Sequence, residues 1–257
     1  MRCYATPGFC AWIEMKQLIV GAGKLGIELS DRQIEQFELY YRELIGWNRR
    51  VNLTAITDYS SVQVKHFLDS LTVTLALPER ELQRPDFNVA DIGTGAGFPG
   101  LPLKILLPRP RLVLIEPTAK KTAFLQHIVR KLELKNVEVM NARAEEAAHL
   151  PLYREQFALV LSRAVALLPT LVELTLPFCQ VGGRFIAQKK GEIEQEVARA
   201  KEAIAVLGGK LNPIRRIELE EFSDARYLAI IDKIFPTPGK YPRRAGLPKR
   251  RPIQEVK

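Results

Sequence analysis

A glycine-rich stretch at residues 89–100, Val-Ala-Asp-Ile-Gly-Thr-Gly-Ala-Gly-Phe-Pro-Gly, has the residue types and spacing to bind a nucleotide. Its glycines supply backbone that turns sharply and lets a ligand approach closely. Residues 88–92 have the pattern of a short buried strand, and the apolar run after the loop predicts a helix that ends before Pro108. A strand, a glycine loop and a helix in this order predict a nucleotide site.

The acids near the loop distinguish between two classes of nucleotide. Asp91 would repel a pyrophosphate but suits a cationic sulfonium ligand. A dinucleotide fingerprint has Gly-x-Gly-x-x-Gly, whereas this loop has Gly-x-Gly-x-Gly, and Phe98 stands where the third glycine is needed. Glu116, at the end of the next predicted strand, is placed to accept hydrogen bonds from a ribose diol. The pattern favours S-adenosylmethionine, and a nicotinamide dinucleotide is the alternative.

Strands alternate with helices along most of the chain. The predicted strands are 88–92, 111–116, 137–140, 157–162, 184–188, 214–219 and 227–234. This order predicts an α/β fold with a mostly parallel, seven-stranded sheet, helices on both faces and an antiparallel hairpin at one edge. A ligand binds such a sheet at the carboxyl ends of the strands, where the strand order reverses. The glycine loop is expected at that point.

Residues 15–80 are predicted to form an N-terminal helical cap. Ser30 and Gln33 have the spacing of a capping box before an amphipathic helix, and residues 62–77 predict a further helix. Between these helices, residues 47–54 mix arginines, amides and a tryptophan. They are expected either to line an RNA surface or to form a packed interhelical loop.

Within the predicted helix 62–77, His66 and Asp69 stand three residues apart and share one helical face. Such a pair is more often structural and hydrogen-bonded than catalytic. We therefore expect these two side chains to form a structural hydrogen-bonded pair.

The rest of the chain divides by composition. With 257 residues, 47% of them hydrophobic, it is long enough for one large domain with a small appendage. Residues 1–14 are predicted to be a disordered extension, residues 81–235 the ligand-binding core and residues 236–257 a basic, Pro-rich tail. The formal net charge is +9, and residues 233–257 alone carry +7. Such a tail either attracts a polyanion, nucleic acid first, or is a solvated terminus.

Composition also excludes several classes of protein. No apolar run reaches the roughly 18 residues that span a bilayer, so we expect no membrane segment. The three cysteines have no metal-ligand or redox spacing, which predicts no metal site and favours a reduced, cytoplasmic setting.

Several separated motifs together resemble the GidB family of small-subunit ribosomal RNA guanine-N7 methyltransferases, and the likeness runs from about Met15 into the tail. The motifs are Asn52-Leu53-Thr54, His66-Phe67-Leu68-Asp69-Ser70, the glycine loop from Asp91, Arg143-Ala144-Glu145-Glu146, Ser162-Arg163-Ala164 and Tyr241-Pro242-Arg243-Arg244. The resemblance implies a class I, Rossmann-like methyltransferase fold, S-adenosylmethionine as donor and one guanine of the small-subunit (16S) ribosomal RNA as acceptor.

The resemblance also implies which residues form the site. The cofactor-binding positions are Gly93, Gly95, Phe98, Glu116, Pro117, Thr118, Ala144, Glu145 and Arg163. Arg163 and Lys189 are expected to position the substrate through phosphate or the guanine O6 edge, and the alternative for each is a salt bridge to Glu116 or Asp91. Lys190 follows Lys189 directly, so the sequence leaves open which lysine faces the site.

The acceptor determines the expected mechanism. Guanine N7 carries a lone pair and no proton, so methylation there needs no general base, and holding the reactants in line would supply the catalysis. The competing functions are a nicotinamide-dinucleotide oxidoreductase and a non-catalytic RNA-binding protein. We expect ribosomal RNA or the subunit particle as partner and a monomer as the oligomeric state.

Overall fold

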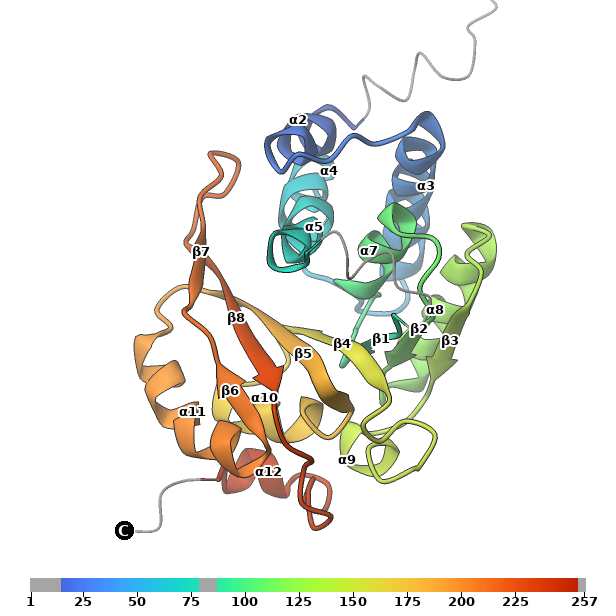
Figure 1. Ribbon diagram of the computed structural model, residues 1–257. Helices are drawn as coiled ribbons and strands as arrows, with labels where there is room; N and C mark the ends of the chain where they lie inside the picture. Colours follow the sequence, from blue (N-terminus) through green and yellow to red (C-terminus); the bar gives the residue numbers. More distant parts are fainter. Residues whose placement is uncertain (1–14, 79–86, 254–257) are drawn as a thin grey trace, which may run out of the picture.

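The computed structural model describes residues 15–78 and 87–253. A single mixed sheet forms the centre of the molecule. Its strands are β1 (Val89–Ile92), β2 (Leu112–Ile115), β3 (Val137–Met140), β4 (Phe157–Arg163), β5 (Cys179–Lys190), β6 (Gly209–Leu211), β7 (Arg215–Ile217) and β8 (Arg226–Lys233). They lie in the order β3-β2-β1-β4-β5-β8-β6, and β7 also pairs with β8 (Figure 1). Strands β1 to β5 pair in parallel, and β8 is antiparallel to its neighbours.

This topology places the reversal of strand order between β1 and β4. The chain moves outward from β1 to β3 and then returns to the other side of β1. Ligands of open α/β sheets bind in the crevice at such a reversal. The parallel sheet and its antiparallel edge are as predicted.

The described residues form a sheet of eight strands, whereas seven were predicted, and the difference lies at its outer edge. Both β6 and β7 pair with the same strand, with Leu211 opposite Ile231 and Arg215 opposite Leu228. Pro213 lies between them and has no backbone N–H to continue the ladder, so it divides one edge position into two short strands. The three residues of β6 are too few to produce a detectable alternating pattern.

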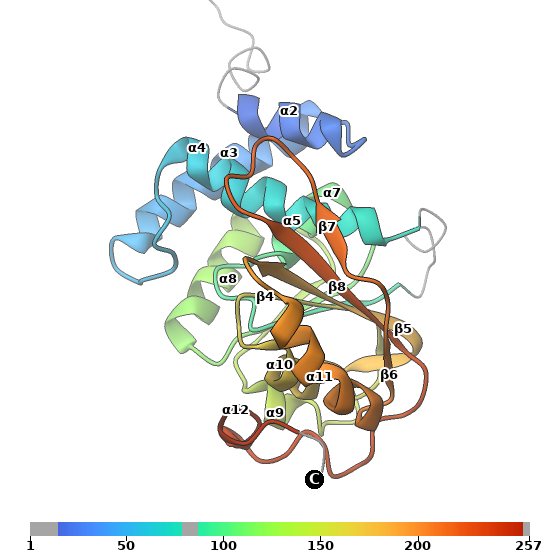
Figure 2. The same cartoon turned by 90° about the vertical axis from the view of Figure 1, so that its left-hand side faces the viewer.

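Alternate strand residues pack on opposite faces of the sheet, as the pleat requires. Val89 and Leu114 join one apolar cluster together with α7 (Gly100–Leu106) and α8 (Ala119–Lys131). Ala90 and Val113 join another cluster on the opposite face. That cluster includes residues of α9 (Ala144–Ala147), α10 (Leu168–Thr175) and α11 (Glu194–Val206). Figures 1 and 2 show these helices in two layers, one on each side of the sheet.

The N-terminal helices cover the first of these faces. They are α2 (Lys16–Lys24), α3 (Asp31–Asn48), α4 (Tyr59–Val62) and α5 (Asp69–Leu71). The predicted capping box at the start of α3 is present, since the Ser30 hydroxyl accepts from the backbone N–H of Gln33 and the Gln33 side chain accepts from that of Ser30. Apolar residues of these helices belong to the same cluster as Val89 and Leu114. The cap therefore shares its core with the sheet.

The predicted helix 62–77 is not one regular α-helix. A π-helical segment, Gln63–Leu68, joins α4 to α5, and a 3-10 segment, Thr72–Ala76, follows α5. Wide helical turns of this kind occur frequently at functional sites. Here the π segment carries His66, which reaches the pocket described below.

The C-terminal residues return beneath the sheet. Residues 241–242 and Pro248 are buried, and α12 (Leu247–Arg250) packs on α10 (Figure 1). The extension predicted at residues 1–14 lies outside the described residues, as do residues 79–86 and 254–257.

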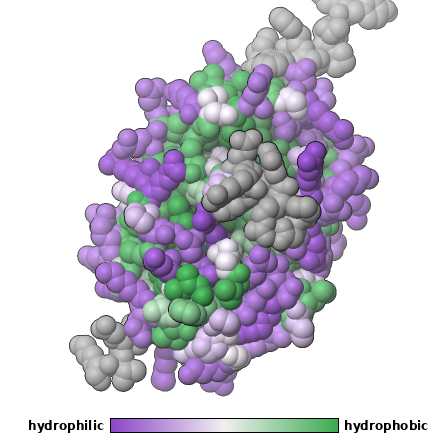
Figure 3. All heavy atoms as spheres, viewed as in Figure 1, coloured by the Kyte–Doolittle hydropathy of each residue, from purple (hydrophilic) through white to green (hydrophobic). Residues whose placement is uncertain are grey.

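Most large apolar side chains are buried in the two clusters, and hydrophilic side chains predominate around the face seen in Figure 3. In the described residues, no helix combines the length and apolar character needed to cross a membrane. The same residues contain no group of His, Cys, Asp and Glu side chains that would hold a metal ion.

Candidate functional site

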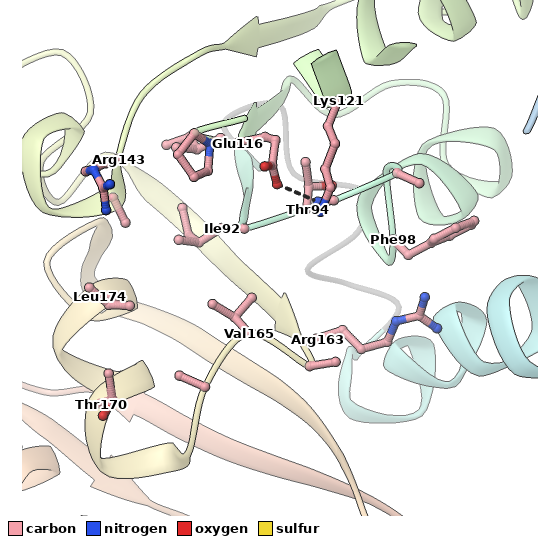
Figure 4. A pocket seen from close by; sticks show the side chains of 18 of the residues that line it. Ile92, Thr94, Phe98, Glu116, Lys121, Arg143, Arg163, Val165, Thr170 and Leu174 are labelled. Atoms are coloured by element: carbon pink, nitrogen blue, oxygen red, sulfur yellow. Dashed lines mark hydrogen bonds between the residues drawn. The ribbon is translucent and has the colours of Figure 1, made fainter. Parts of the chain in front are cut away.

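A pocket of about 520 Å³ opens at the carboxyl ends of β1 and β4 (Figure 4). Its size is typical of a cofactor site. The glycine loop, the ends of β2 and β4, the start of α9 and parts of the cap and C-terminal segment all contribute to its wall. The predicted residues that line it are Gly93, Gly95, Phe98, Glu116, Pro117, Ala144, Glu145 and Arg163.

Asp91 shapes the glycine loop from beneath and does not line the pocket. Its Oδ2 accepts hydrogen bonds from the Thr94 hydroxyl at 2.6 Å and from the backbone N–H of Gly100 at 2.8 Å. Burial raises the pKa of this carboxyl to about 6. Its bonds tie the two ends of the loop together, so Asp91 supports the loop and is not part of the pocket wall.

Glu116 points into the pocket beside Thr94 (Figure 4). Its Oε2 accepts from the backbone N–H of Gly95 at 3.1 Å, and its Oε1 accepts from the N–H of Thr118 at 3.0 Å. A carboxylate has about four acceptor sites, so it can hold both amides and still accept hydrogen bonds from a diol. Thr118, predicted to bind the cofactor, lies outside the lining and contacts Glu116 instead.

Gly93 brings the loop close to β4. Its φ of +69° is in the left-handed region, and a Cβ there would lie 2.6 Å from Val165 Cγ2. Only glycine meets both conditions without strain. Val165 stands near the centre of the pocket, between Thr170 and Phe98 (Figure 4).

Arg163 ends β4 and is held by the cap. Its NH1 donates to Asp69 Oδ2 at 2.9 Å and to the carbonyl of Lys65 at 3.0 Å, and its NH2 lies 3.1 Å from His66 Nδ1. The guanidinium also stands over the ring of Phe98, at 5.0 Å from its centroid. The alternative salt bridge to Glu116 or Asp91 was wrong, because the partner is Asp69. The predicted pairing of His66 with Asp69 exists only through this arginine.

The contacts of His66 fix its protonation. A guanidinium can only donate, so Nδ1 accepts from Arg163, and Nε2–H donates to Thr54 Oγ1 at 2.7 Å. The ring stacks on Phe98 with 4.6 Å between centroids. Burial and the neighbouring Arg163 lower the pKa of His66 to about 3. The imidazole is neutral at physiological pH, and both nitrogens are engaged.

This buried, neutral imidazole predicts a pH dependence of stability. In the unfolded chain His66 binds a proton below about pH 6.5, whereas in the folded protein it does so only near pH 3. The free energy of unfolding should therefore decrease as the pH is lowered from about 6.5 towards 3, by on the order of 1 kcal/mol per pH unit from this group. Urea unfolding at a series of pH values should show a steeper loss for the wild type than for His66→Gln. Parallel curves for the wild type and His66→Gln would contradict the assignment.

A second pocket of about 550 Å³ adjoins the first and shares His66, Arg163 and residues 164–166 with it. Lys189 and Lys190 both line this second pocket and not the first. The Nζ of Lys189 donates to the carbonyl of Ala166 at 2.7 Å and forms an ion pair with Glu196. The alternative of a salt bridge from Lys189 to Glu116 or Asp91 was therefore wrong. Of the two lysines at this pocket, Lys190 is the exposed one.

Two residues that line the second pocket each have a buried side-chain atom without a hydrogen-bond partner among the described residues. The atoms are the Nε donor of Arg226 and the Oε1 acceptor of Gln188. Buried polar groups are usually satisfied, and an unsatisfied one requires an explanation.

Sequence reasoning did not assign several residues of the first pocket. Leu53, Thr54 and His66 belong to motifs that were recognised but not placed at the ligand. The loop that carries Leu53 and Thr54 is packed, because Asn48 Oδ1 accepts from the N–H groups of both. The C-terminal Gly246 and Lys249 also line the pocket, and no local pattern marks them.

Comparison with known proteins gives consistent results. The sequence model of the GidB family, described as rRNA small subunit methyltransferase G, matches residues 33–222. A relative from Dehalococcoides mccartyi strain CBDB1, named ribosomal RNA small subunit methyltransferase G, is 51% identical over 239 residues, which cover 93% of this chain and all of the relative. A protein of the same name from Brevibacillus brevis strain 47 is 45% identical over 228 residues, covering 89% of this chain and 94% of the relative.

Among solved structures, the chain is similar to geranyl diphosphate C-methyltransferase from Streptomyces coelicolor A3(2). The TM-score is 0.51 at 14% identity, covering 76% of this chain and 98% of that one. A mutant of MtNAS in complex with S-adenosylmethionine also has a TM-score of 0.51, at 12% identity, covering 80% of this chain and 77% of that one. Likeness at these identities concerns the fold alone, which is that of class I methyltransferases.

Proposed function

The chain belongs to the GidB family of small-subunit ribosomal RNA methyltransferases, and on that premise we propose that it transfers a methyl group from S-adenosylmethionine to N7 of one guanine in that RNA. The observation that carries the proposal is the pair of adjoining pockets at the reversal of strand order, which share His66, Arg163 and residues 164–166. A group-transfer enzyme needs two ligands to meet, and this shared wall is where they would do so.

The first pocket fits the donor. S-adenosylmethionine, when bound, supplies a methyl group activated by the positive charge of its sulfonium. Glu116 has acceptor capacity for the ribose diol, and the glycine loop exposes backbone for close approach. Pro117 and Ala144 supply apolar surface for an adenine ring. Glu116 already accepts from the Gly95 N–H of the glycine loop, a donor of the kind that a pyrophosphate would need, and this disfavours the dinucleotide oxidoreductase.

The second pocket suits a base as acceptor. Gln188, whose amide offers both an acceptor and donors, lines it together with the donors Lys190 and Arg226. Guanine presents both kinds of group. Its N7 needs no deprotonation, which agrees with a neutral His66 whose nitrogens are both engaged.

Charge at the shared wall is nearly balanced. A bare cation next to N7 would oppose the positive charge that the purine gains on methylation. The guanidinium of Arg163 is paired with the buried carboxylate of Asp69 at 2.9 Å. Because Asp69 offsets the charge of Arg163, the guanidinium can orient a neighbouring group without placing a full positive charge beside N7.

Exposed basic side chains around the pockets suit RNA phosphates. Arg49 and Arg50 stand on the loop that also supplies Leu53 and Thr54, and Lys190 stands at the second pocket. Further exposed cations, Arg244, Arg250 and Arg251, lie on the C-terminal segment. We infer ribosomal RNA or the subunit particle as partner, a cytoplasmic setting and action as a monomer.

Lys190 provides a test of this RNA surface. Lys190→Gln should weaken RNA binding a few-fold and reduce the slope of log affinity against log salt by about one, as expected for one lost phosphate contact. The measurement is a salt titration of binding to small-subunit RNA. Lys201→Gln, an exposed lysine on α11, is the control, and identical slopes for the two variants would remove Lys190 from the interface.

The proposed activity is tested by transfer of labelled methyl from S-adenosylmethionine to small-subunit RNA or particles, followed by mapping of the modified nucleotide. We expect one 7-methylguanosine that is absent from cells lacking the gene. RNA binding without transfer would indicate the non-catalytic alternative. Calorimetric binding of a nicotinamide dinucleotide in place of S-adenosylmethionine would indicate the oxidoreductase.

A further inference from the structure

The C-terminal segment 241–250 lies beyond the residues that the family model matches, which end at 222. It follows the last strand of the sheet and returns beneath α10, where α12 packs (Figure 1). The sequence predicted a basic tail here. Its inner side, however, meets the first pocket, since Gly246 and Lys249 both line that pocket.

A buried ion pair fixes this segment to the core. Glu173, on α10, is fully buried, and its Oε1 accepts from both the backbone N–H and Nε of Arg243 at 2.8 Å. Its Oε2 accepts from Arg243 NH2 at 2.6 Å. A bidentate arginine–carboxylate pair restricts both distance and orientation.

Backbone contacts on either side add to this anchor. The carbonyl of Tyr241 accepts from Arg154 NH1 at 2.9 Å, and that of Pro242 lies 2.8 Å from His149 Nε2. The Thr170 hydroxyl, itself part of the pocket wall, donates to the carbonyl of Pro248 at 3.3 Å. The segment is therefore attached before and after Gly246.

One hydrogen bond joins this segment to Glu145 in the pocket wall. The backbone N–H of Gly246 donates to Glu145 Oε1 at 2.9 Å. In the described part of the chain, no hydrogen bond involves the other oxygen of Glu145, and the residue lines the pocket beside Ala144. That second oxygen can accept from an exocyclic amino group, such as that of adenine.

We propose that residues 241–250 form the outer wall of the methyl donor pocket, and that the Gly246 N–H positions the Glu145 carboxylate to receive the adenine amino group. This inference rests on the proposed function, because it takes S-adenosylmethionine as the ligand. Gly246 is a positioning residue, which acts on the donor through Glu145, and the Arg243–Glu173 pair anchors the segment that carries Gly246.

Gly246→Ala tests the proposal. Gly246 has φ of +79°, and a Cβ there meets no atom within 4 Å, so alanine introduces backbone strain without a clash. The strain should shift the N–H away from Glu145 and weaken binding of S-adenosylhomocysteine in calorimetry by about tenfold, the effect of losing a hydrogen bond to a charged group. The KM for the donor should rise similarly, while the KM for RNA stays unchanged.

Gly26→Ala is the matched control. Gly26 also has a positive φ, +75°, with no atom within 4 Å of a Cβ, but it follows α2 in the cap and does not line the pocket. Both variants should lose similar thermal stability, and only Gly246→Ala should lose donor affinity. Equal donor affinity in the two variants would overturn the proposal. A wild-type protein that does not bind the ligand would instead refute the proposed function.

Hydrogen exchange of the unmodified protein provides an independent measurement. S-adenosylhomocysteine should slow exchange of the backbone amides in residues 241–250 as well as in the glycine loop. Protection of the loop alone would overturn the proposal even if Gly246→Ala failed to fold.

Discussion

Glu116→Gln is expected to weaken binding of S-adenosylmethionine by about a hundredfold, because it removes charge-assisted hydrogen bonds on both sides of the side chain. The carboxylate now accepts from the N–H of Gly95 on one oxygen and from the N–H of Thr118 on the other. A glutamine amide has only one oxygen, so its NH2 must face one of these two donors. The same substitution removes an acceptor for the ribose diol, so the loop and the ligand are affected together.

Calorimetry with S-adenosylmethionine measures this loss directly. Glu146→Gln is the control, because Glu146 is an exposed acid that does not line the pocket, and its affinity should match that of the wild type. Thermal unfolding distinguishes a lost ligand contact from a lost fold. Donor affinity within a few-fold of the wild type in Glu116→Gln would mean that Glu116 only supports the loop.

The parts of the site that could be predicted from the sequence are those formed by short continuous stretches of the chain. The glycine loop, Glu116 and the start of α9 each follow a strand, and parallel strands place their carboxyl ends at one edge of the sheet. The expected alternation of strands and helices was therefore enough to bring Gly93, Glu116 and Ala144 to one edge of the sheet. The fold was predictable for the same reason, since alternating strands and helices allow few topologies.

The partners of the charged residues could not be predicted, because they depend on long-range packing. Arg163 bonds to Asp69, 94 positions earlier in the chain, and nothing in either motif identifies the other. Asp91 precedes the glycine loop, and its side chain turns towards Gly100 at the other end of that loop. Adjacent residues of a strand point to opposite faces of the sheet, so a shift of one position along the strand changes which face a side chain meets.

The cap also contributes to the site in a way that its own sequence does not reveal. Tyr40, on α3, donates to the carbonyl of Ala96 at 2.5 Å and stacks on Phe98 with 5.4 Å between ring centroids. The ring of Phe98 lies in turn against His66 and Arg163. Only the packed structure shows that Tyr40 supports the glycine loop.

Arg163→Met is expected both to destabilise the protein by about 3 kcal/mol and to abolish methylation. Asp69 is buried, and loss of its partner leaves a charge with little compensation, which typically costs about 3–5 kcal/mol. The remaining cation near it, Arg226, lies 3.8 Å away and is already paired with Asp224 at 3.0 Å. Urea unfolding and methyl transfer to RNA measure the two effects separately.

The double variant Arg163→Met/Asp69→Asn separates the structural role of Arg163 from its role in the reaction. Asparagine removes the uncompensated charge with almost no change in volume, so much of the lost stability should return. Methylation should not return, because no guanidinium stands at the wall between the two pockets, and the KM for RNA should remain raised or the rate remain undetectable. If activity recovered together with stability, Arg163 would only hold the cap to β4, and substrate positioning would fall to the remaining donors of the second pocket, Arg226 and Lys190.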